Sequence, residues 1–201
     1  MMKEVVIARY KEKLSWINLL PEDVLINVFN KGGDDFILSN ANNFILENVG
    51  RESDTYLRYI VNRYDTLPDC VLFLQGSIDD RLDQKIFNLH DFFNVATSWS
   101  FVGALRTCFE DEGWGKELDY KHNISNFDLT FGEFQKHFIG IDFHKHSLFV
   151  PGAYFLVGRD LIRRHPINFY QNLLLTELGT HQNPRFGHFM ERSWFRIFQG
   201  F

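Results

Sequence analysis

Val5-Val6-Ile7-Ala8 is a short apolar run, and its composition indicates a strand that is buried on both faces. Two similar runs follow, Val24 to Phe29 and Cys70 to Leu74. Helical spacing of apolar residues predicts helices from Leu14 to Leu20 and from Arg51 to Tyr64, so that strands and helices alternate. This order predicts parallel strands joined by crossover connections.

The alternation predicts an α/β fold: one Rossmann-like domain with a mostly parallel central sheet and helices on both faces. A chain of 201 residues suits a single domain. Asp34 to Glu47 is polar and rich in Asn, which predicts a loop. The apolar C-terminal residues favour a domain that belongs to a longer protein.

Charge and composition exclude several classes of protein. The net charge of −5 argues against a general nucleic-acid binder. The N-terminus lacks the pattern of a signal peptide, and no apolar run approaches the roughly 20 residues of a membrane span. The two cysteines, Cys70 and Cys108, have no metal-site spacing, which favours a reduced protein in the cytoplasm.

The three predicted strands each end in polar residues. These ends are Arg9-Tyr10, Asn30-Lys31 and the segment from Gln75 to Asp80. Sheets of parallel strands bind ligands in a crevice beyond the carboxyl ends of the strands. The sequence therefore predicts a polar crevice at this edge of the sheet.

Asn48-Val49-Gly50-Arg51-Glu52 precedes the second predicted helix and has the features of a phosphate site. Asn and Gly favour a turn, and the free N–H groups of a helix N-terminus attract anions. An arginine adds two parallel donors that suit a phosphate edge. The alternative is a capped helix with an arginine on the surface.

Asp79 and Asp80 follow the predicted strand that ends at Leu74. Carboxylates in this position are suitable ligands for Mg²⁺ or Mn²⁺, which would hold a diphosphate. An acidic turn that caps the next helix is the alternative, since Asp favours helix starts. The residues alone leave both interpretations open.

Three later segments contain candidate functional residues. Asp142, His144 and His146 would share one face of a strand, but a solvated loop is the favoured interpretation. Gly152-Ala153 would allow a ligand to approach the backbone. His188 and Glu191 are three residues apart on a predicted final helix, where a Glu among aromatic residues suits a general base. For Glu191 taken alone, a surface carboxylate paired with Arg192 or Arg196 is the favoured interpretation.

The chain resembles nucleotide-sugar glycosyltransferases of the GT-A type, and most of all the small glycosyltransferase domains of large algal viruses and related fungal and bacterial proteins. The segments that carry the resemblance are Val5 to Tyr10, Asn48 to Glu52 with Thr55 to Leu57, Phe73 to Gly76, and His188 to Trp194. The chain has no GxSxG, Walker A or GxGxxG motif that would indicate another class. The N-x-G-R-[DE] element also resembles one in rhamnan-synthesis glycosyltransferases, which favours L-rhamnose over glucose.

The resemblance implies that residues 1–80 form a nucleotide-binding half and residues 81–201 an acceptor and sugar half. It also implies a role for each matching residue. The donor nucleotide is expected to contact Ala8, Arg9, Tyr10, Asn48, Gly50, Arg51 and Gln75. The sugar and the acceptor are expected to contact Gly152, Ala153 and Tyr154, with Glu191 as the catalytic base. Asp79, Asp80 and His188 are the expected metal ligands, although the family's Asp-x-Asp is replaced here by Ser77-Ile78-Asp79.

These roles together predict a glycosyltransferase that moves a hexose or deoxyhexose, of the glucose or L-rhamnose class, from a UDP- or dTDP-sugar. The acceptor would be a hydroxyl of a glycan or glycoprotein, and Mn²⁺ or Mg²⁺ would assist. The expected location is the cytoplasm, which for a protein from a virus is the cytoplasm of the host cell. Two other functions stay open: a metal-dependent phosphoesterase that uses Asp79, Asp80 and the Asp142/His144/His146 cluster, and a carbohydrate- or nucleotide-binding domain without catalysis.

Overall fold

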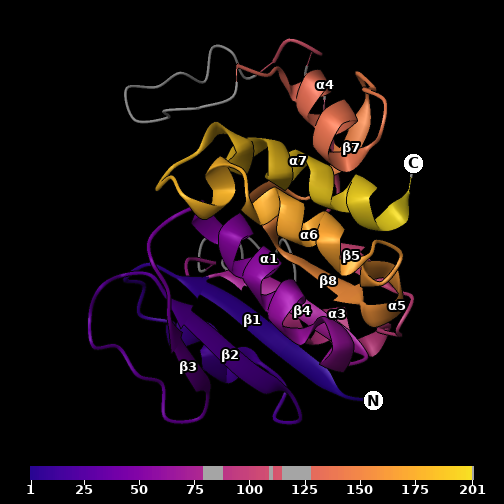
Figure 1. The fold of residues 1–201 in the computed structure, drawn as a ribbon. Coiled ribbons are helices and arrows are strands. Elements are labelled where there is room, and N and C mark those ends of the chain that lie inside the picture. Colours follow the sequence, from indigo (N-terminus) through magenta and orange to yellow (C-terminus); the bar gives the residue numbers. More distant parts are fainter. Residues whose placement is uncertain (79–87, 109–110, 115–127, 201) are drawn as a thin grey trace.

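A six-stranded sheet forms the centre of the computed structural model, which describes residues 1–78, 88–108, 111–114 and 128–200 (Figure 1). The strand order is β3-β2-β1-β4-β8-β5. The strands are β1 (Lys3–Arg9), β2 (Leu25–Asn30), β3 (Asn42–Ile45), β4 (Cys70–Gln75), β5 (Phe101–Gly103) and β8 (Phe155–Gly158).

The first four strands of this sheet run parallel. β1 pairs with β2 on one side and with β4 on the other, and β2 pairs with β3. β8 runs antiparallel to both β4 and β5. The predicted α/β fold with a mostly parallel sheet is confirmed, and the three strands expected from the sequence lie together with β1 in the middle.

Side chains of β1 and β4 alternate between two apolar cores, one on each face of the sheet. Val6 and Phe73 point into the core that contains helices α1 (Arg51–Arg63), α5 (Arg159–Ile162), α6 (Ile167–Leu174) and α7 (Arg185–Gln199). Val5 and Leu72 point into the opposite core, which contains a 3₁₀ turn (Ser15–Leu19) and α3 (Leu89–Asn94). Figure 1 shows α1, α6 and α7 stacked over one face. Burial on both faces explains why these strands are almost continuously apolar.

A buried carboxylate fixes α1 against the sheet. Oε2 of Glu4 in β1 accepts hydrogen bonds from Asn27 of β2 at 2.9 Å and from the hydroxyl of Tyr59 at 2.8 Å. Its Oε1 pairs with Arg63 at 2.9 Å. Because a buried charge is tolerated only where partners surround it, this network sets the position of α1 along the strands.

The structure corrects two local predictions. The segment Asp34 to Glu47 was expected to be a loop, but it contains β3, the edge strand, whose four residues are all exposed. An edge strand needs no apolar run, and Phe44 alone stacks on Phe29 at 4.7 Å. The helix expected over Leu14 to Leu20 is only a 3₁₀ turn, which starts after Leu14 in a left-handed conformation with φ 53°.

The remaining elements cover one end of α7. They are β6 (Arg106–Cys108) and β7 (Ser147–Phe149), which form a separate antiparallel pair, and α4 (Phe131–Phe134), which continues as a π-helix (Gln135–Ile139). A short 3₁₀ turn (Pro151–Ala153) separates β7 from β8. Within the described ranges, no helix has the length and apolar character needed to cross a bilayer.

Candidate functional site

A cavity of ≈ 590 Å³ opens where the parallel strands end. It is lined by Ala8, Arg9, Tyr10, Glu12, Lys31, Asn48, Arg51, Glu52, Gln75, Gln182 and Asn183. Its walls therefore come from the carboxyl ends of β1 and β4, the residue after β2, the start of α1 and the loop before α7. This is the edge at which open α/β sheets bind their ligands.

The start of α1 forms one wall of the cavity. Gly50 and Arg51 are both left-handed, with φ 63° and 54°, so the chain turns sharply into the helix. Gly50 is the N-cap and provides no capping side chain. The N–H groups of the first helical turn have no acceptor within the helix, and they carry the positive end of its dipole. An anion is favoured at this wall.

A buried lysine holds this turn in place. Nζ of Lys31 donates to the carbonyl oxygens of Val49 at 2.6 Å and Arg51 at 2.7 Å, and to the carboxylate of Asp54 at 2.8 Å. Burial lowers the pKa of Lys31, and the charge of Asp54 opposes that shift. Because its three donors are all used, Lys31 acts as a clamp that offsets the strain of the left-handed Arg51 and is not a free cation for a ligand.

Arg51 itself lies between the cavity and α7. Its Nη1 is 2.9 Å from Nε2 and 3.2 Å from Nδ1 of His188. Burial lowers the pKa of His188 to about 4, and the charges of Arg51 and Arg192 add to the shift. The imidazole is therefore neutral near pH 7, so it accepts a hydrogen bond from Arg51 and leaves the guanidinium charged and a third exposed, at 32%.

We expect His188 to remain neutral until the pH falls to about 4, as monitored by the NMR shifts of its ring protons. The unfolded chain binds this proton near pH 6.5, so stability from this residue is complete above pH 6.5 and is lost as the pH falls toward 4. Arg51→Ala should raise the pKa of His188, since one of the repelling charges is gone. A titration of His188 near pH 6.5 in the folded protein would contradict this environment.

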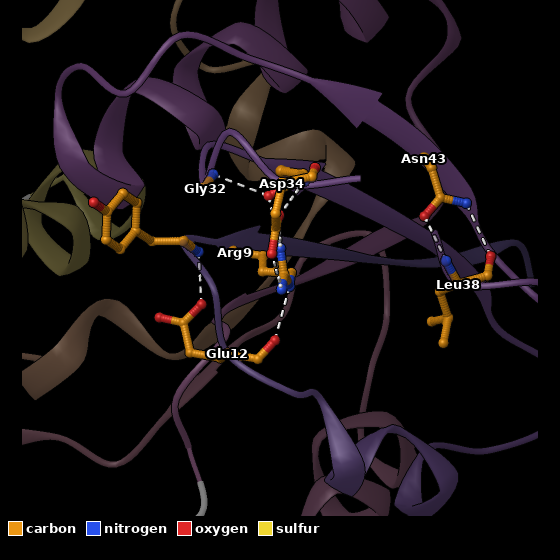
Figure 2. Close-up of polar contacts among 8 residues, drawn as sticks. Arg9, Glu12, Gly32, Asp34, Leu38 and Asn43 are labelled. Carbon is orange, nitrogen blue, oxygen red and sulfur yellow. Dashed lines mark hydrogen bonds and ion pairs between the residues drawn. The ribbon is translucent and has the colours of Figure 1, made fainter. Parts of the chain in front are cut away.

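Arg9 is buried and forms most of its hydrogen bonds within the fold. Its guanidinium donates to both carboxylate oxygens of Asp34, at 2.7 and 2.9 Å, to Asn30 at 2.8 Å and to the carbonyl of Glu12 at 2.7 Å (Figure 2). It also stacks on Phe36, 3.8 Å from the ring centre. These bonds hold the pKa of Asp34 well below its usual range. Arg9 thus shapes the loops that border the cavity, and four of its five N–H donors are occupied.

The end of β4 is fastened to the segment Gly152–Tyr154, which was expected to face the sugar. Gln75 donates to the carbonyl of Gly152 at 2.8 Å, and the Gly152 N–H donates to Oε1 of Glu191 at 2.8 Å. The hydroxyl of Tyr154 donates to the carbonyl of Ser77 at 2.9 Å. Gly152, Ala153, Tyr154 and Glu191 are therefore joined to the cavity through Gln75, but they do not line it themselves.

Glu52 lines the cavity and is only 7% exposed. Arg51 is its closest cation in the described chain, with Nε 3.7 Å from Oε2, which is beyond hydrogen-bond length. Burial raises the pKa of Glu52, and the nearby Glu191 adds to the rise while Arg51 and Lys31 oppose it. Its own backbone N–H faces the carboxylate, and among the described residues no other group donates a hydrogen bond to it.

Of the residues expected to contact a donor nucleotide, all except Gly50 line the cavity. Gly50 is next to these residues in the chain and packs closely against the 3₁₀ turn Glu177–Gly179, which precedes α7. A Cβ added at Gly50 would be 1.9 Å from the carbonyl oxygen of Leu178 in that turn. Lys31 also lines the cavity, as the polar end of its strand predicted, whereas Glu12, Gln182 and Asn183 line it without having been expected there. A polar residue in the loop after a strand was the available signal for Glu12.

Of the three expected metal ligands, the structure describes His188. Asp79 and Asp80 lie outside the residues that the structure describes. His188 has the guanidinium of Arg51 at 2.9 Å, and a cation in that place would repel a metal ion. Residues 1–78, 88–108, 111–114 and 128–200 contain no group of three His, Cys, Asp or Glu suited to a metal.

The cluster Asp142/His144/His146 lies elsewhere. All three residues are exposed, in the segment that leads into β7. Asp142 forms an ion pair with Lys136, and the two histidines line a different cavity of ≈ 360 Å³ beside Phe195 and Arg196. The solvated-loop interpretation therefore holds, and this cluster does not contribute to the cavity at the sheet edge.

The chain is similar to one family over less than half of its length. Residues 5–92 match the family described as "Protein of unknown function (DUF3431)". The match contains β1 to β4 and α1, and so the cavity residues from Ala8 to Gln75. No curated protein matches the chain.

Proposed function

We propose that the cavity binds the diphosphate of a nucleotide sugar and that the protein is a glycosyltransferase. The observation that carries the proposal is the start of α1, where an uncapped helix N-terminus and the charged Arg51 meet at one wall of the cavity. Both features attract a phosphate group. Lys31 uses all three of its donors and the buried Arg9 uses four of its five, so Arg51 is the cation with the most donors to spare at this wall of the described structure.

The rest of the lining suits a ligand that carries hydroxyl groups. Asn48, Gln75, Gln182 and Asn183 offer side-chain amides, which both donate and accept hydrogen bonds. Tyr10 lines the cavity and is 47% exposed, with Nζ of Lys11 5.3 Å from its ring centre, and an aromatic ring of this kind suits stacking on a nucleobase. A volume of ≈ 590 Å³ is within the range of small-molecule sites.

In the proposed reaction, an acceptor hydroxyl oxygen bonds to the anomeric carbon of the sugar. The bond from that carbon to the diphosphate breaks, and its electron pair stays on the diphosphate oxygen. Arg51 and the N-terminus of α1 would stabilise this charge. The acceptor proton passes to a carboxylate, and Glu191 is the candidate, because its Oε1 is fixed by the Gly152 N–H next to Gln75.

A metal ion on the diphosphate, held by Asp79, stays a prediction. The site as described offers Arg51 and the helix N-terminus for the same charge, so no step here depends on a metal. Comparing ligand binding with and without Mn²⁺ tests whether one takes part.

The test of this function is a thermal-unfolding screen with UDP, dTDP, UDP-glucose and dTDP-L-rhamnose, each with and without Mn²⁺. A ligand at a hundredfold excess over its Kd should stabilise the protein by about 2.7 kcal/mol. We expect at least one nucleotide sugar to do so. Stabilisation by none of the four would reject the function, and release of phosphate from simple phosphate esters would favour a phosphoesterase.

A further inference from the structure

Glu52 is a buried carboxylate at the place where a diphosphate is expected. It is the residue after Arg51, and both side chains line the same cavity. A charged group that is 7% exposed normally has hydrogen-bond partners, because burial without them costs several kcal/mol. In the described chain Glu52 has its own N–H and a cation at 3.7 Å. Its remaining acceptor capacity is therefore directed at whatever fills the cavity.

The other carboxylates at or near the cavity already accept hydrogen bonds from other residues. Glu12 accepts a hydrogen bond from the Tyr10 N–H at 2.6 Å, and Asp34 is held by Arg9 through both of its oxygens. Glu191 accepts from the Gly152 N–H and does not line the cavity. Among these carboxylates, Glu52 is therefore the buried one that lacks hydrogen-bond donors from other described residues.

A free diphosphate does not meet that need. Phosphate oxygens are acceptors, so an ionised Glu52 close to them would meet another negative charge. The hydroxyl groups of a sugar next to the diphosphate are donors, and a carboxylate accepts such bonds strongly. A ligand with hydroxyls directly beside its phosphates satisfies Arg51 and Glu52 together.

We propose that Glu52 recognises hydroxyl groups of the sugar attached to the diphosphate, and so makes the site selective for a nucleotide sugar over a free nucleotide. This inference rests on the proposed function, because it takes the diphosphate to lie at Arg51. Glu52 would thus determine which ligand binds, whereas Glu191 is the candidate that takes the proton from the acceptor.

The experiment compares Glu52→Gln with the wild-type protein by calorimetric titration of two pairs of ligands: UDP with UDP-glucose, and dTDP with dTDP-L-rhamnose. The substitution keeps the shape and removes the charge. We expect the nucleotide sugar that binds to lose about 10- to 100-fold in affinity, the effect of one charged hydrogen bond. The matching free nucleotide should bind about two- to tenfold more tightly, since a nearby like charge is gone.

Glu12→Gln is the matched control, because it makes the same change at another carboxylate of the same cavity. It should change the affinities for nucleotide and nucleotide sugar in the same direction. Glu52→Asp retains the charge on a shorter side chain; it should keep the wild-type affinity for the free nucleotide and lose affinity for the sugar. This second variant also replaces Glu52→Gln if that protein does not fold.

Opposite changes for the two ligands of a pair in Glu52→Gln, or a loss for the nucleotide sugar alone in Glu52→Asp, would support the inference. Equal changes, or none, in both Glu52 variants would overturn it while the binding of nucleotide sugars still stood. If the wild-type protein binds none of the four ligands, the proposed function fails, and the role of Glu52 fails with it.

Discussion

Gly50→Ala should destabilise the protein by about 2–5 kcal/mol, because the substitution combines backbone strain with overpacking. Gly50 has φ 63°, a conformation that costs an L-residue energy. An added Cβ would be 1.9 Å from the carbonyl oxygen of Leu178 and 2.4 Å from Cβ of Asp54. Because the first of these is a backbone atom, no rotation of a side chain relieves the contact. Urea unfolding of both proteins measures the difference.

Gly33→Ala is the control for the strain alone. Gly33 has nearly the same conformation, with φ 68°, but an added Cβ there has no neighbour within contact distance. We expect a cost of only about 1–2 kcal/mol for this variant. Equal losses of stability in the two variants would mean that the loop around Leu178 does not pack against the turn as described. The cavity wall at Arg51 would then lack its support.

The strands were predictable from the sequence because their chemistry is local. Val5 to Ala8 and Cys70 to Leu74 are apolar without interruption, which is what burial on both faces of a sheet requires. β3 was missed for the opposite reason. Its residues are exposed at the sheet edge, and Asn43 fixes the local chain through two hydrogen bonds with the backbone of Leu38 (Figure 2). No apolar pattern accompanies a strand of that kind.

The location of the cavity was also predictable. Polar residues directly after buried parallel strands meet at one edge by geometry, and Arg51 follows a Gly at a helix start. The partners with which each side chain forms hydrogen bonds and ion pairs were not predictable. Arg9 is bonded to Asp34, and Lys31 to Asp54, so both cations are occupied by partners more than twenty residues away. A sequence shows the charges but not these pairings.

The contribution of the C-terminal part could not be derived from the sequence for the same reason. Gln182 and Asn183 reach the cavity from the loop before α7, which is fixed to the turn by the bond from the Gly50 N–H to the carbonyl of His181 at 2.7 Å. The bond between Arg51 and His188 likewise joins residues 137 positions apart. Both contacts depend on how α7 packs against α1, and helical periodicity does not fix that packing.

Arg51→Ala should weaken the binding of UDP or dTDP by about 10- to 150-fold, the effect of losing a charged hydrogen bond of roughly 1.5–3 kcal/mol. The reason is the position of Arg51 at the uncapped start of α1, with a neutral His188 as its hydrogen-bond partner and the carboxylate of Glu52 at 3.7 Å, beyond hydrogen-bond length. Arg51→Lys should restore only part of the affinity, since an ammonium lacks the two parallel donors. Calorimetric titration with the two nucleotides gives the values.

The structure supplies a close control for this experiment. Arg159 is also the first residue of a helix, also follows a glycine, and has a similar side-chain exposure of 29% against 32% for Arg51. Its guanidinium pairs with Asp69 at 3.2 Å, and it does not line the cavity. Arg159→Ala should therefore leave nucleotide binding unchanged.

A third variant separates binding from stability. Arg51 has φ 54°, which a glycine adopts freely, so Arg51→Gly removes the guanidinium and the backbone strain together. The free energy of unfolding should then stay within about 1 kcal/mol of the wild-type value, because the gain from relieved strain offsets the lost contact with His188. Nucleotide affinity should fall as in Arg51→Ala. A nucleotide affinity equal to that of the wild type in both variants would remove Arg51 from the phosphate site, and the start of α1 alone would not be enough to support a diphosphate there.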